Sequence, residues 1–345
     1  MMFAVSLFSG AGGLDIAFER SGLLTTIACM DFSHDCIRTL ETNRLKFDSV
    51  TSRPYLPQAK VFKVDLSKAS SESIQSLVGS DVDVIYGGPP CQSFSVLGKR
   101  GGMLDQRGDL TLKFADTITE IKPRAFLMEN VPGLLTIDGG KQFSRLINQF
   151  KKSGFQVTYG VLCAADYGSA TLRKRLFVIG ARDSKSVTLP LPTHCDLSKL
   201  KISQSLFTPT LKPWVPCGPR LNDPGALEVL TNQTFVKHKE EIVERFAALD
   251  FGERDHKRRR NRLNPNLPSH TLFVGGGKLK GQARSHIHPY QNREITPREC
   301  AEIHGFPTNW EFYGEHDSCL QQVANSVPIE LGSAIAKHMM SCISK

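Results

Sequence analysis

The sequence has no long hydrophobic run, since no stretch approaches the ~18 apolar residues that a membrane-spanning helix needs. Its start lacks the basic region of a secretory signal, and residues 3–7 fit a first strand better. None of the nine cysteines forms a Cys-x-x-Cys pair, which argues against a zinc site and against a disulfide framework. We therefore expect a protein of the reducing cytoplasm, with no metal and no membrane anchor.

The balance of charge is basic. The 345 residues carry a net charge of +9 at pH 7, which suits a polyanionic partner such as nucleic acid. Basic residues are densest at 254–262. This run indicates contacts to the phosphates of such a partner, with a solvated loop as the alternative. The residues expected to make these contacts are Lys257, Arg258, Arg259 and Arg260.

The first 182 residues alternate short apolar runs with longer helix-like stretches. The predicted strands are 3–7, 24–30, 59–64, 82–86, 125–128, 156–162 and 176–179, and the predicted helices are 14–21, 34–43, 70–78, 110–121 and 141–152. This alternation predicts an α/β domain with a doubly wound, mostly parallel sheet. Ligands of such sheets bind beyond the carboxyl ends of the strands.

The pattern changes near residue 188, where proline becomes dense and periodicity is lost. Two further helices are predicted, at 235–249 and at 329–343. We therefore expect a first domain over 1–187, a smaller domain over 188–311 and a C-terminal segment over 312–345.

The most informative stretch is Gly-Gly-Pro-Pro-Cys-Gln-Ser at residues 87–93, which follows a predicted strand. Each proline fixes its own φ and restricts the residue before it, so the thiol of Cys91 is held in a rigid turn, as a nucleophile requires. A lone cysteine is more often a small core residue. The companion motifs decide between these interpretations.

A glycine-rich turn, Phe-Ser-Gly-Ala-Gly-Gly at residues 8–13, follows the first predicted strand. Such a turn lets a ligand approach the backbone and aims helix N–H groups at negative charge. Asp15 stands where the dinucleotide fingerprint has its third glycine. The turn therefore matches a pyrophosphate site poorly, which disfavours a nicotinamide dehydrogenase.

Further motifs follow in a fixed order: Met-Glu-Asn-Val-Pro-Gly at 128–133, Arg-Lys-Arg at 173–175, Thr-Pro-Arg-Glu-Cys at 296–300, Gly-Phe-Pro at 305–307 and Gln-Val-Ala-Asn-Ser-Val at 322–327. With the glycine-rich turn and Pro-Pro-Cys, this set resembles the bacterial-type DNA (cytosine-5) methyltransferases from residue 3 to about 340, except over 183–261. Two positions depart from the family pattern: Thr171 replaces Gln, and Ala324 replaces Gly.

The resemblance implies the fold of S-adenosylmethionine-dependent methyltransferases, with that cofactor and a specific duplex DNA sequence as substrate. It implies that the Cys91 thiolate attacks carbon 6 of cytosine and that Glu129 holds or protonates ring nitrogen 3. Arg175 would contact the base oxygen, and Arg173 would brace the cysteine loop or a phosphate. Because the target base lies inside the stack, it must be flipped out.

The resemblance also implies cofactor contacts. Asp31 would take the ribose hydroxyls, Phe32 with Phe8 would pack on the adenine, and Asp65 would accept the adenine amino group. Either aspartate alone is as often a helix cap or turn residue. The other residues expected at the cofactor are Gly10, Gly12, Gly13, Pro89, Asn325 and Ser326.

The stretch 92–107 is rich in Gly and Ser and partly basic, which predicts a mobile loop that closes over DNA. Ser93, Lys99 and Arg100 are its expected DNA contacts. The family implies a target-recognition domain over 188–311, a C-terminal segment that returns to the catalytic domain, and a monomer that associates with the nucleoid through DNA. A restriction endonuclease that acts separately is a further expected partner.

Two alternatives stay open at the level of sequence. One is a tRNA cytosine-5 methyltransferase of the same fold, whose usual Pro-Pro-Cys-Gln-Pro-Phe differs here at Ser93. The other is a catalytically inactive DNA-binding relative. Such a relative would be expected to have lost Cys91 or Glu129, and both are in place.

Overall fold

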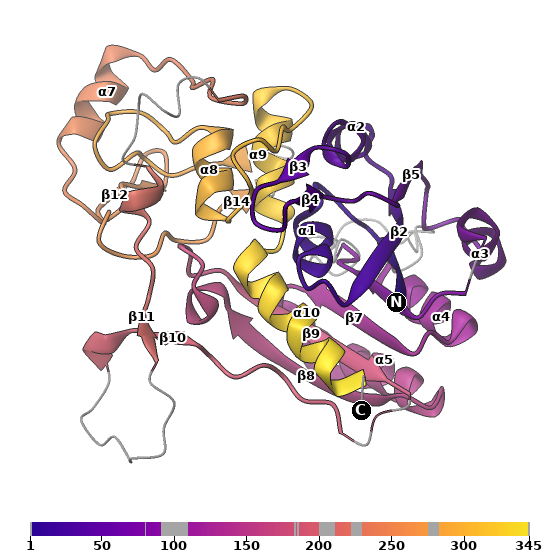
Figure 1. The fold of residues 1–345 in the computed structure, drawn as a ribbon. Coiled ribbons are helices and arrows are strands. Elements are labelled where there is room, and N and C mark those ends of the chain that lie inside the picture. Colours follow the sequence, from indigo (N-terminus) through magenta and orange to yellow (C-terminus); the bar gives the residue numbers. More distant parts are fainter. Residues whose placement is uncertain are drawn as a thin grey trace, which may run out of the picture. The chain divides into compact units, whose positions relative to one another are not determined.

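Figure 1 shows the computed structural model of the chain, which describes residues 2–79, 81–90, 110–182, 184, 186–199, 211–221, 230–274 and 283–343. The chain divides into two compact units. Unit 1 comprises Met1–Leu162, Lys174–Pro190 and Ser333–Lys345, and unit 2 comprises Cys163–Arg173 and Leu191–Gly332. Residues 163–173 and 312–332 thus group with unit 2 by their contacts, and the last residues rejoin unit 1. The predicted roles of the domains stay predictions.

Unit 1 is built on a seven-stranded sheet with the order β5-β2-β1-β6-β7-β9-β8. Its strands are β1 (Met2–Leu7), β2 (Leu24–Asp31), β5 (Lys60–Lys63), β6 (Val84–Gly87), β7 (Ala125–Asn130), β8 (Gln156–Cys163) and β9 (Lys174–Ala181). Strands β5, β2, β1, β6 and β7 pair in parallel, whereas β9 runs antiparallel to β7. The predicted mostly parallel α/β fold is confirmed, and every predicted strand matches a strand of this sheet within a few residues.

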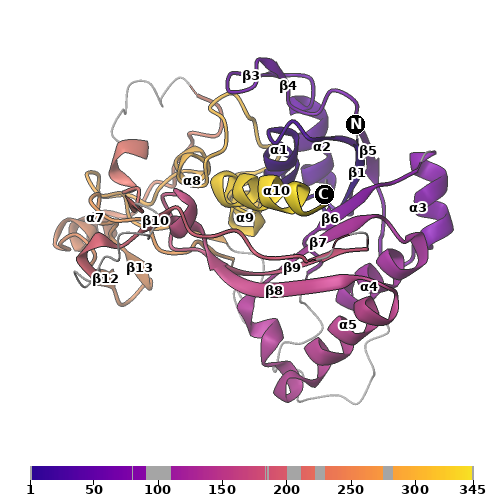
Figure 2. The same ribbon diagram turned by 60° about the horizontal axis from the view of Figure 1, so that its bottom comes forward.

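Helices flank this sheet on both faces. They are α1 (Gly13–Glu19), α2 (His34–Asn43), α3 (Ser71–Val78), α4 (Leu110–Ile121), α5 (Lys141–Lys152) and α10 (Ile329–Ile343), and a small hairpin joins β3 (Phe47–Asp48) to β4 (Arg53–Pro54). The bounds of α2, α4, α5 and α10 are those predicted. Helices α4 and α5 cover one face, and α1 and α10 lie over the other (Figure 2).

Aromatic side chains fill the layers on either side of the sheet. Phe126 of β7 packs on Phe150 of α5, with ring centroids 4.3 Å apart. From α1, Phe18 stacks on Tyr86 of β6 at 4.2 Å. All four rings are fully buried. Burial of this kind stabilises each side chain by about 1.5–3 kcal/mol, which fixes the helices against the sheet and holds the strand ends in place.

Unit 2 contains short elements. Its helices are α7 (Glu240–Ala247), α8 (Pro297–Ile303) and α9 (His316–Asn325), and its strand pairs are β10 (His194–Cys195) with β11 (Lys212–Pro213), β12 (Arg254–Asp255) with β13 (Arg260–Asn261) and β14 (Phe273–Val274) with β15 (Ala283–Arg284). One buried arginine connects several segments of this unit. The fully buried Arg298 of α8 donates hydrogen bonds to the carbonyls of Thr231, Pro307 and Trp310. This arginine thereby joins three separate segments.

The prediction of a helix over 235–249 was wrong in extent, because α7 begins at Glu240. The preceding segment is held in a different conformation: Asn232 has φ +64° and exchanges two 2.8 Å hydrogen bonds with the backbone of Phe312. Helices α8 and α9 were not predicted. For α8 the signal was present, since Thr296 and Glu299 form a capping box around Pro297.

Candidate active site

The glycine-rich turn after β1 has a left-handed backbone at several positions. The angle φ is +55° at Phe8, +56° at Gly10 and +87° at Gly12. Glycine adopts these angles at little cost, whereas Phe8 must be held there by its surroundings. A Cβ atom built on Gly10 would meet no atom of the described residues within 4 Å. One side of the turn is therefore open to a ligand.

Asp31, the last residue of β2, holds this turn. Its Oδ2 accepts a hydrogen bond from the Gly10 N–H, and its Oδ1 accepts one from the Ser33 N–H, each at 2.8 Å. Burial raises the pKa of the Asp31 carboxyl, and these two N–H groups oppose the rise. A carboxylate offers about four acceptor positions, so Asp31 can still accept the predicted ribose hydroxyls.

The two side chains predicted at the adenine differ in their surroundings. Phe32 is 67% exposed, so its ring is available for stacking. Asp65 accepts hydrogen bonds from the backbone and hydroxyl of Ser67 and lies 3.2 Å from Lys68 Nζ. The hydrogen bonds from Ser67 are the main reason why the pKa of Asp65 is lowered. Asp65 is therefore a turn residue, and its contact with the adenine stays a prediction.

Asp15, which replaces the third glycine of a dinucleotide fingerprint, points into the protein. It is fully buried and accepts hydrogen bonds from the Cys29 thiol (3.2 Å) and the Tyr86 hydroxyl (3.1 Å). Burial raises the pKa of the Asp15 carboxyl. This residue therefore ties α1 to β2 and β6.

Glu129 and Arg175 form an ion pair where strand β7 ends and strand β9 begins. Arg175 Nε lies 2.9 Å from Glu129 Oε1, and the side chains are 14% and 11% exposed. Burial lowers the pKa of Arg175, and the charge of Glu129 opposes this effect. Residues 129 and 175 meet because β9 runs antiparallel to β7, with Asn130 opposite Leu176. The structure thus brings together two of the predicted catalytic residues.

The Pro-Pro segment is fixed beside this pair. Asn130 Nδ2 donates to the Pro89 carbonyl at 3.0 Å, and its Oδ1 accepts from the Val131 N–H at 2.8 Å. A Cβ atom on Gly88 would lie 2.8 Å from Glu129 Oε2, so glycine leaves room beside this oxygen. Sequence analysis had assigned no role to Gly88 or Asn130. The parallel register of β6 and β7, which sets Gly87 opposite Met128, was the missing information.

Four predicted site residues lie outside the described residues: Cys91, Ser93, Lys99 and Arg100. The chain is described up to Pro90, and it resumes at Leu110. Their predicted roles stay predictions.

Arg173 ends the stretch of unit 2 that precedes β9, and its side chain is fully buried. A buried guanidinium favours the bracing role over the phosphate contact. Thr171, at the family's Gln position, is also buried and its hydroxyl lies 3.4 Å from the Ser269 carbonyl. The stronger support comes from the backbone, where Leu172 N donates to Ser269 O and Ser269 N donates to Ala170 O, each at 2.8 Å.

The basic run folds into the β12–β13 hairpin, and part of it is used within unit 2. Arg260 Nε lies 3.1 Å from Glu294 Oε1, and these side chains are 13% and 11% exposed. Arg258 Nη1 donates to His238 Nδ1 at 3.2 Å. Two members of the predicted DNA-binding set therefore have intramolecular partners.

The other two members of the set are open to solvent. Lys257 is 71% exposed and lies 3.8 Å from the exposed Glu241. Arg259 is exposed and occupies the hairpin turn with φ +56°. If the run contacts DNA, these two side chains can do so without breaking a buried interaction.

Asn325 and Ser326, which were predicted at the cofactor, end α9 in unit 2. Asn325 is exposed, and the Ser326 hydroxyl donates to the Val323 carbonyl at 2.7 Å. This bond closes the helix end. Contact with the cofactor stays a prediction for both.

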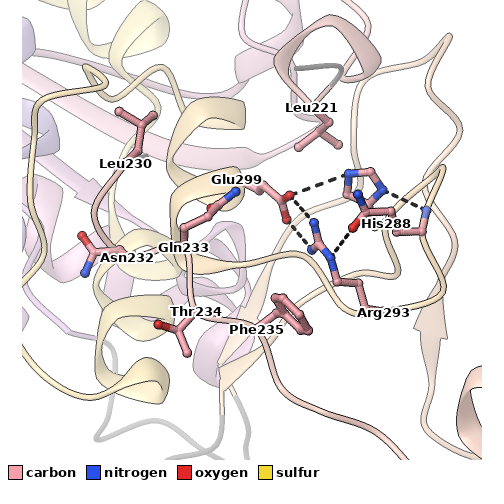
Figure 3. Close-up of a pocket in the computed structure, with 10 residues that line it drawn as sticks. Leu221, Leu230, Asn232, Gln233, Thr234, Phe235, His288, Arg293 and Glu299 are labelled. Atoms are coloured by element: carbon pink, nitrogen blue, oxygen red, sulfur yellow. Dashed lines mark hydrogen bonds and ion pairs between the residues drawn. The ribbon is translucent and has the colours of Figure 1, made fainter. Parts of the chain in front are cut away.

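A cavity of about 390 Å³ lies in unit 2, and Figure 3 shows its lining. Arg293 donates two hydrogen bonds, of 2.6 and 2.8 Å, to the Glu299 carboxylate. Its guanidinium also lies over the Phe235 ring, 5.3 Å from the centroid. Burial lowers the pKa of His288 to about 4, so this histidine is neutral at pH 7. Its Nδ1 accepts two backbone N–H groups. The charged groups of the cavity thus bond to one another, and we assign them a structural role.

The described residues contain no group of three or more His, Cys, Asp or Glu side chains placed to hold a metal ion. Among their helices, none is long and apolar enough to cross a membrane.

Comparison with known proteins gives one consistent result. The model of the C-5 cytosine-specific DNA methylase family matches residues 2–341. The chain is 30% identical to the type II methyltransferase M1.HphI of Haemophilus parahaemolyticus, over 97% of this chain and 86% of that protein. It is also 30% identical to the type II methyltransferase M.MthTI of Methanothermobacter thermautotrophicus, over 97% of this chain and 96% of that protein.

Solved structures agree with this result. A protein described as a DNA modification methyltransferase encoded within a prophage of E. coli superposes with a TM-score of 0.74 at 26% identity, over all of both chains. The S. pombe Dnmt2 methyltransferase superposes with a TM-score of 0.68 at 15% identity, over 99% of each chain, and shows the fold alone.

Proposed function

Because the chain belongs to the C-5 cytosine-specific DNA methylase family and is a DNA (cytosine-5) methyltransferase, we propose that it methylates a cytosine flipped out of one specific duplex sequence, through a covalent adduct with Cys91. The observation that carries this proposal is the arrangement at the ends of β6 and β7. The Glu129–Arg175 pair lies beside Gly88, and Asn130 fixes the carbonyl of Pro89, directly before the Pro-Cys step.

In the proposed reaction, the Cys91 thiolate forms a bond to carbon 6 of the cytosine, and the electron pair of the 5,6 double bond moves to carbon 5. Glu129 holds a proton at ring nitrogen 3, and Arg175 donates to the base oxygen, so that both offset the charge on the ring. After carbon 5 is methylated, a base removes its proton. The freed electron pair restores the double bond, and the Cys91 thiolate leaves.

The family and the fold imply an S-adenosylmethionine cofactor, which supplies the methyl group when bound. We place its binding residues at the glycine-rich turn. The turn is open at Gly10, Asp31 offers acceptors for hydroxyls, and the exposed Phe32 ring offers a stacking face. Acceptors for hydroxyls and a stacking face suit a nucleoside, and the negative charge of Asp31 disfavours a pyrophosphate.

The family implies a DNA substrate. We propose that Lys257 and Arg259 contact its phosphates, while Ser93, Lys99 and Arg100 contact the DNA near the flipped base. Extrusion of the base costs a few kcal/mol, which these contacts must offset. We further propose that the enzyme acts as a monomer on chromosomal DNA in the cytoplasm, with any cognate restriction endonuclease acting separately.

The test begins with the target sequence, which bisulfite sequencing of DNA from expressing cells identifies. A duplex with 5-fluorocytosine at that target should then trap the wild-type enzyme covalently, because fluorine cannot leave as a proton does. Cys91→Ala should abolish both trapping and methyl transfer while DNA binding persists. The matched control is Cys342→Ala, in the last helix, which should trap normally. Trapping that survives in Cys91→Ala would refute the adduct.

A further inference from the structure

The stretch 163–173, which we call the pre-arginine segment, leads directly into the arginine motif. It closes on itself through two backbone hydrogen bonds, from Ala164 N to Arg173 O (2.9 Å) and from Ser169 N to Ala164 O (3.2 Å). The chain then enters β9 at Lys174, and Arg175 meets Glu129. The segment is therefore directly continuous with the start of β9.

Other parts of unit 2 hold the pre-arginine segment at several points. The Asp166 carboxylate accepts a hydrogen bond from Trp214 Nε1 at 2.9 Å. Its later residues pair with Ser269 through the backbone, as described above. A built Cβ atom on Gly168 would lie 2.9 Å from the His194 ring, so the segment also packs closely there. The segment is thus fixed by its neighbours as well as by its own backbone hydrogen bonds.

One anchor joins the segment to the first turn of α10. The hydroxyl of the fully buried Ser169 donates to Glu330 Oε2 at 3.0 Å, while Arg220 Nη2 lies 3.3 Å from Glu330 Oε1. Gly305 makes room for this carboxylate, since a Cβ atom there would lie 2.5 Å from both oxygens. Hydrogen bonds to an ionised acceptor are about twice as strong as neutral ones. The hydrogen bond from Ser169 to the Glu330 carboxylate therefore anchors the segment through a side chain that is fully buried.

We propose that Ser169 and Glu330 are positioning residues for methyl transfer: their hydrogen bond fixes the pre-arginine segment so that Arg173 and Arg175 reach the positions that the reaction needs. The inference rests on the proposed roles of these arginines. A misplacement of about 1 Å can cost about 100-fold in rate, although no contact with substrate is lost. Glu330 was not singled out by any sequence motif, because its partners are far away in the chain.

The contact of Arg220 with the second oxygen of Glu330 provides a control for the Ser169 hydrogen bond. Arg220 binds the other oxygen, is 37% exposed and does not contact the pre-arginine segment among the contacts described. Arg220→Ala therefore removes a partner of Glu330 while leaving the Ser169 bond. Glu330→Gln keeps an acceptor oxygen for Ser169 and removes the ion pair with Arg220.

The experiment compares Ser169→Ala, Glu330→Ala, Glu330→Gln and Arg220→Ala with the wild type on the cognate duplex. We expect Ser169→Ala and Glu330→Ala each to lower kcat about 10-fold, with the KM for DNA and the affinity for S-adenosylmethionine within about 2-fold. The double variant should also lose about 10-fold, since both changes break one contact. Glu330→Gln and Arg220→Ala should keep kcat within about 2-fold.

The proposal is overturned if Ser169→Ala keeps the wild-type kcat, if Arg220→Ala loses as much as Glu330→Ala, or if the losses of the double variant multiply. Urea unfolding checks that each variant is folded, and Glu330→Asp replaces Glu330→Ala if that variant does not fold. Arg175→Ala distinguishes a failure of the proposed role of Arg175 from a failure of the positioning inference. If it retains full activity, the proposed role of Arg175 fails. If it is inactive while Ser169→Ala is normal, that role stands and the positioning inference fails.

Discussion

Two arginine–glutamate pairs in this chain have nearly the same geometry. Arg175 and Glu129 are 2.9 Å apart with side chains 14% and 11% exposed, whereas Arg260 and Glu294 are 3.1 Å apart with side chains 13% and 11% exposed. Distance and burial therefore do not separate a proposed catalytic carboxylate from a structural one.

The surroundings of the two pairs do separate them. Both oxygens of Glu294 are bound within unit 2, because Ser285 Oγ donates to its Oε2 at 3.2 Å. Glu129 Oε2, by contrast, packs against Gly88, where a Cβ atom would lie only 2.8 Å from this oxygen. The Arg260–Glu294 pair thus joins the β12–β13 hairpin to another part of unit 2, whereas the Glu129–Arg175 pair borders the glycine before the Pro-Pro segment.

Changing each glutamate to glutamine tests whether the two pairs differ in function. Glu129→Gln should lower kcat by about 10²–10⁴-fold, because an amide cannot hold or release the proton at ring nitrogen 3. Its affinity for S-adenosylmethionine, measured by calorimetry, should not change. Glu294→Gln is the control and should keep kcat within about 2-fold. An equal loss of rate in both variants would show that the pairs differ only in our interpretation.

The Arg260–Glu294 pair should contribute to the stability of the fold. Arg260→Ala leaves Glu294 largely buried without its cation, which should lower the free energy of unfolding by about 1–3 kcal/mol. Urea unfolding of the full chain measures this loss. Arg259→Ala, next to it in the turn, should lower the free energy of unfolding by at most about 0.5 kcal/mol, since the side chain is exposed. A stable Arg260→Ala variant would mean that the Glu294 pair contributes nothing and that Arg260 is free to bind DNA.

The smallest expected effect is on nonspecific DNA affinity. Arg259→Ala should reduce the slope of log affinity against log salt by about 0.9 if the side chain contacts one phosphate. Cognate and scrambled duplexes should weaken alike, because a phosphate carries no sequence information. Glu241→Gln, beside the exposed Lys257, serves as a control that changes the local charge in the opposite direction and should strengthen binding slightly. An unchanged slope in Arg259→Ala would identify the hairpin turn as a solvated loop.

Unit 1 could be predicted from the sequence because its signals are local. Helix α2 illustrates this, since Ser33 caps it and its apolar residues face the sheet, all within residues 33–43. The positions of Asp31 and Glu129 at strand ends could likewise be predicted from the alternation of strands and helices along the sequence. Their grouping at one edge needed only the rule that parallel strands end together.

Unit 2 could not be predicted in the same way, because its structure depends on contacts between distant residues. Asn232 is held by Phe312, and Ser169 is held by Glu330. The ion pair that engages Arg260 is likewise absent from the local sequence, since Glu294 lies 34 residues away. Composition identified the basic run correctly as a feature, but its division into exposed and engaged arginines depends on packing.

The reversed direction of β9 has a consequence for how this enzyme could be rebuilt. In a parallel sheet, the carboxyl end of every strand lies on the side where ligands bind. Strand β9 instead begins on that side, where its residue Leu176 pairs with Asn130 of β7. A strand of the ordinary direction at this place would carry Arg175 to the opposite edge of the sheet. For protein engineering, any redesign of this part of the sheet must therefore keep the antiparallel direction of β9.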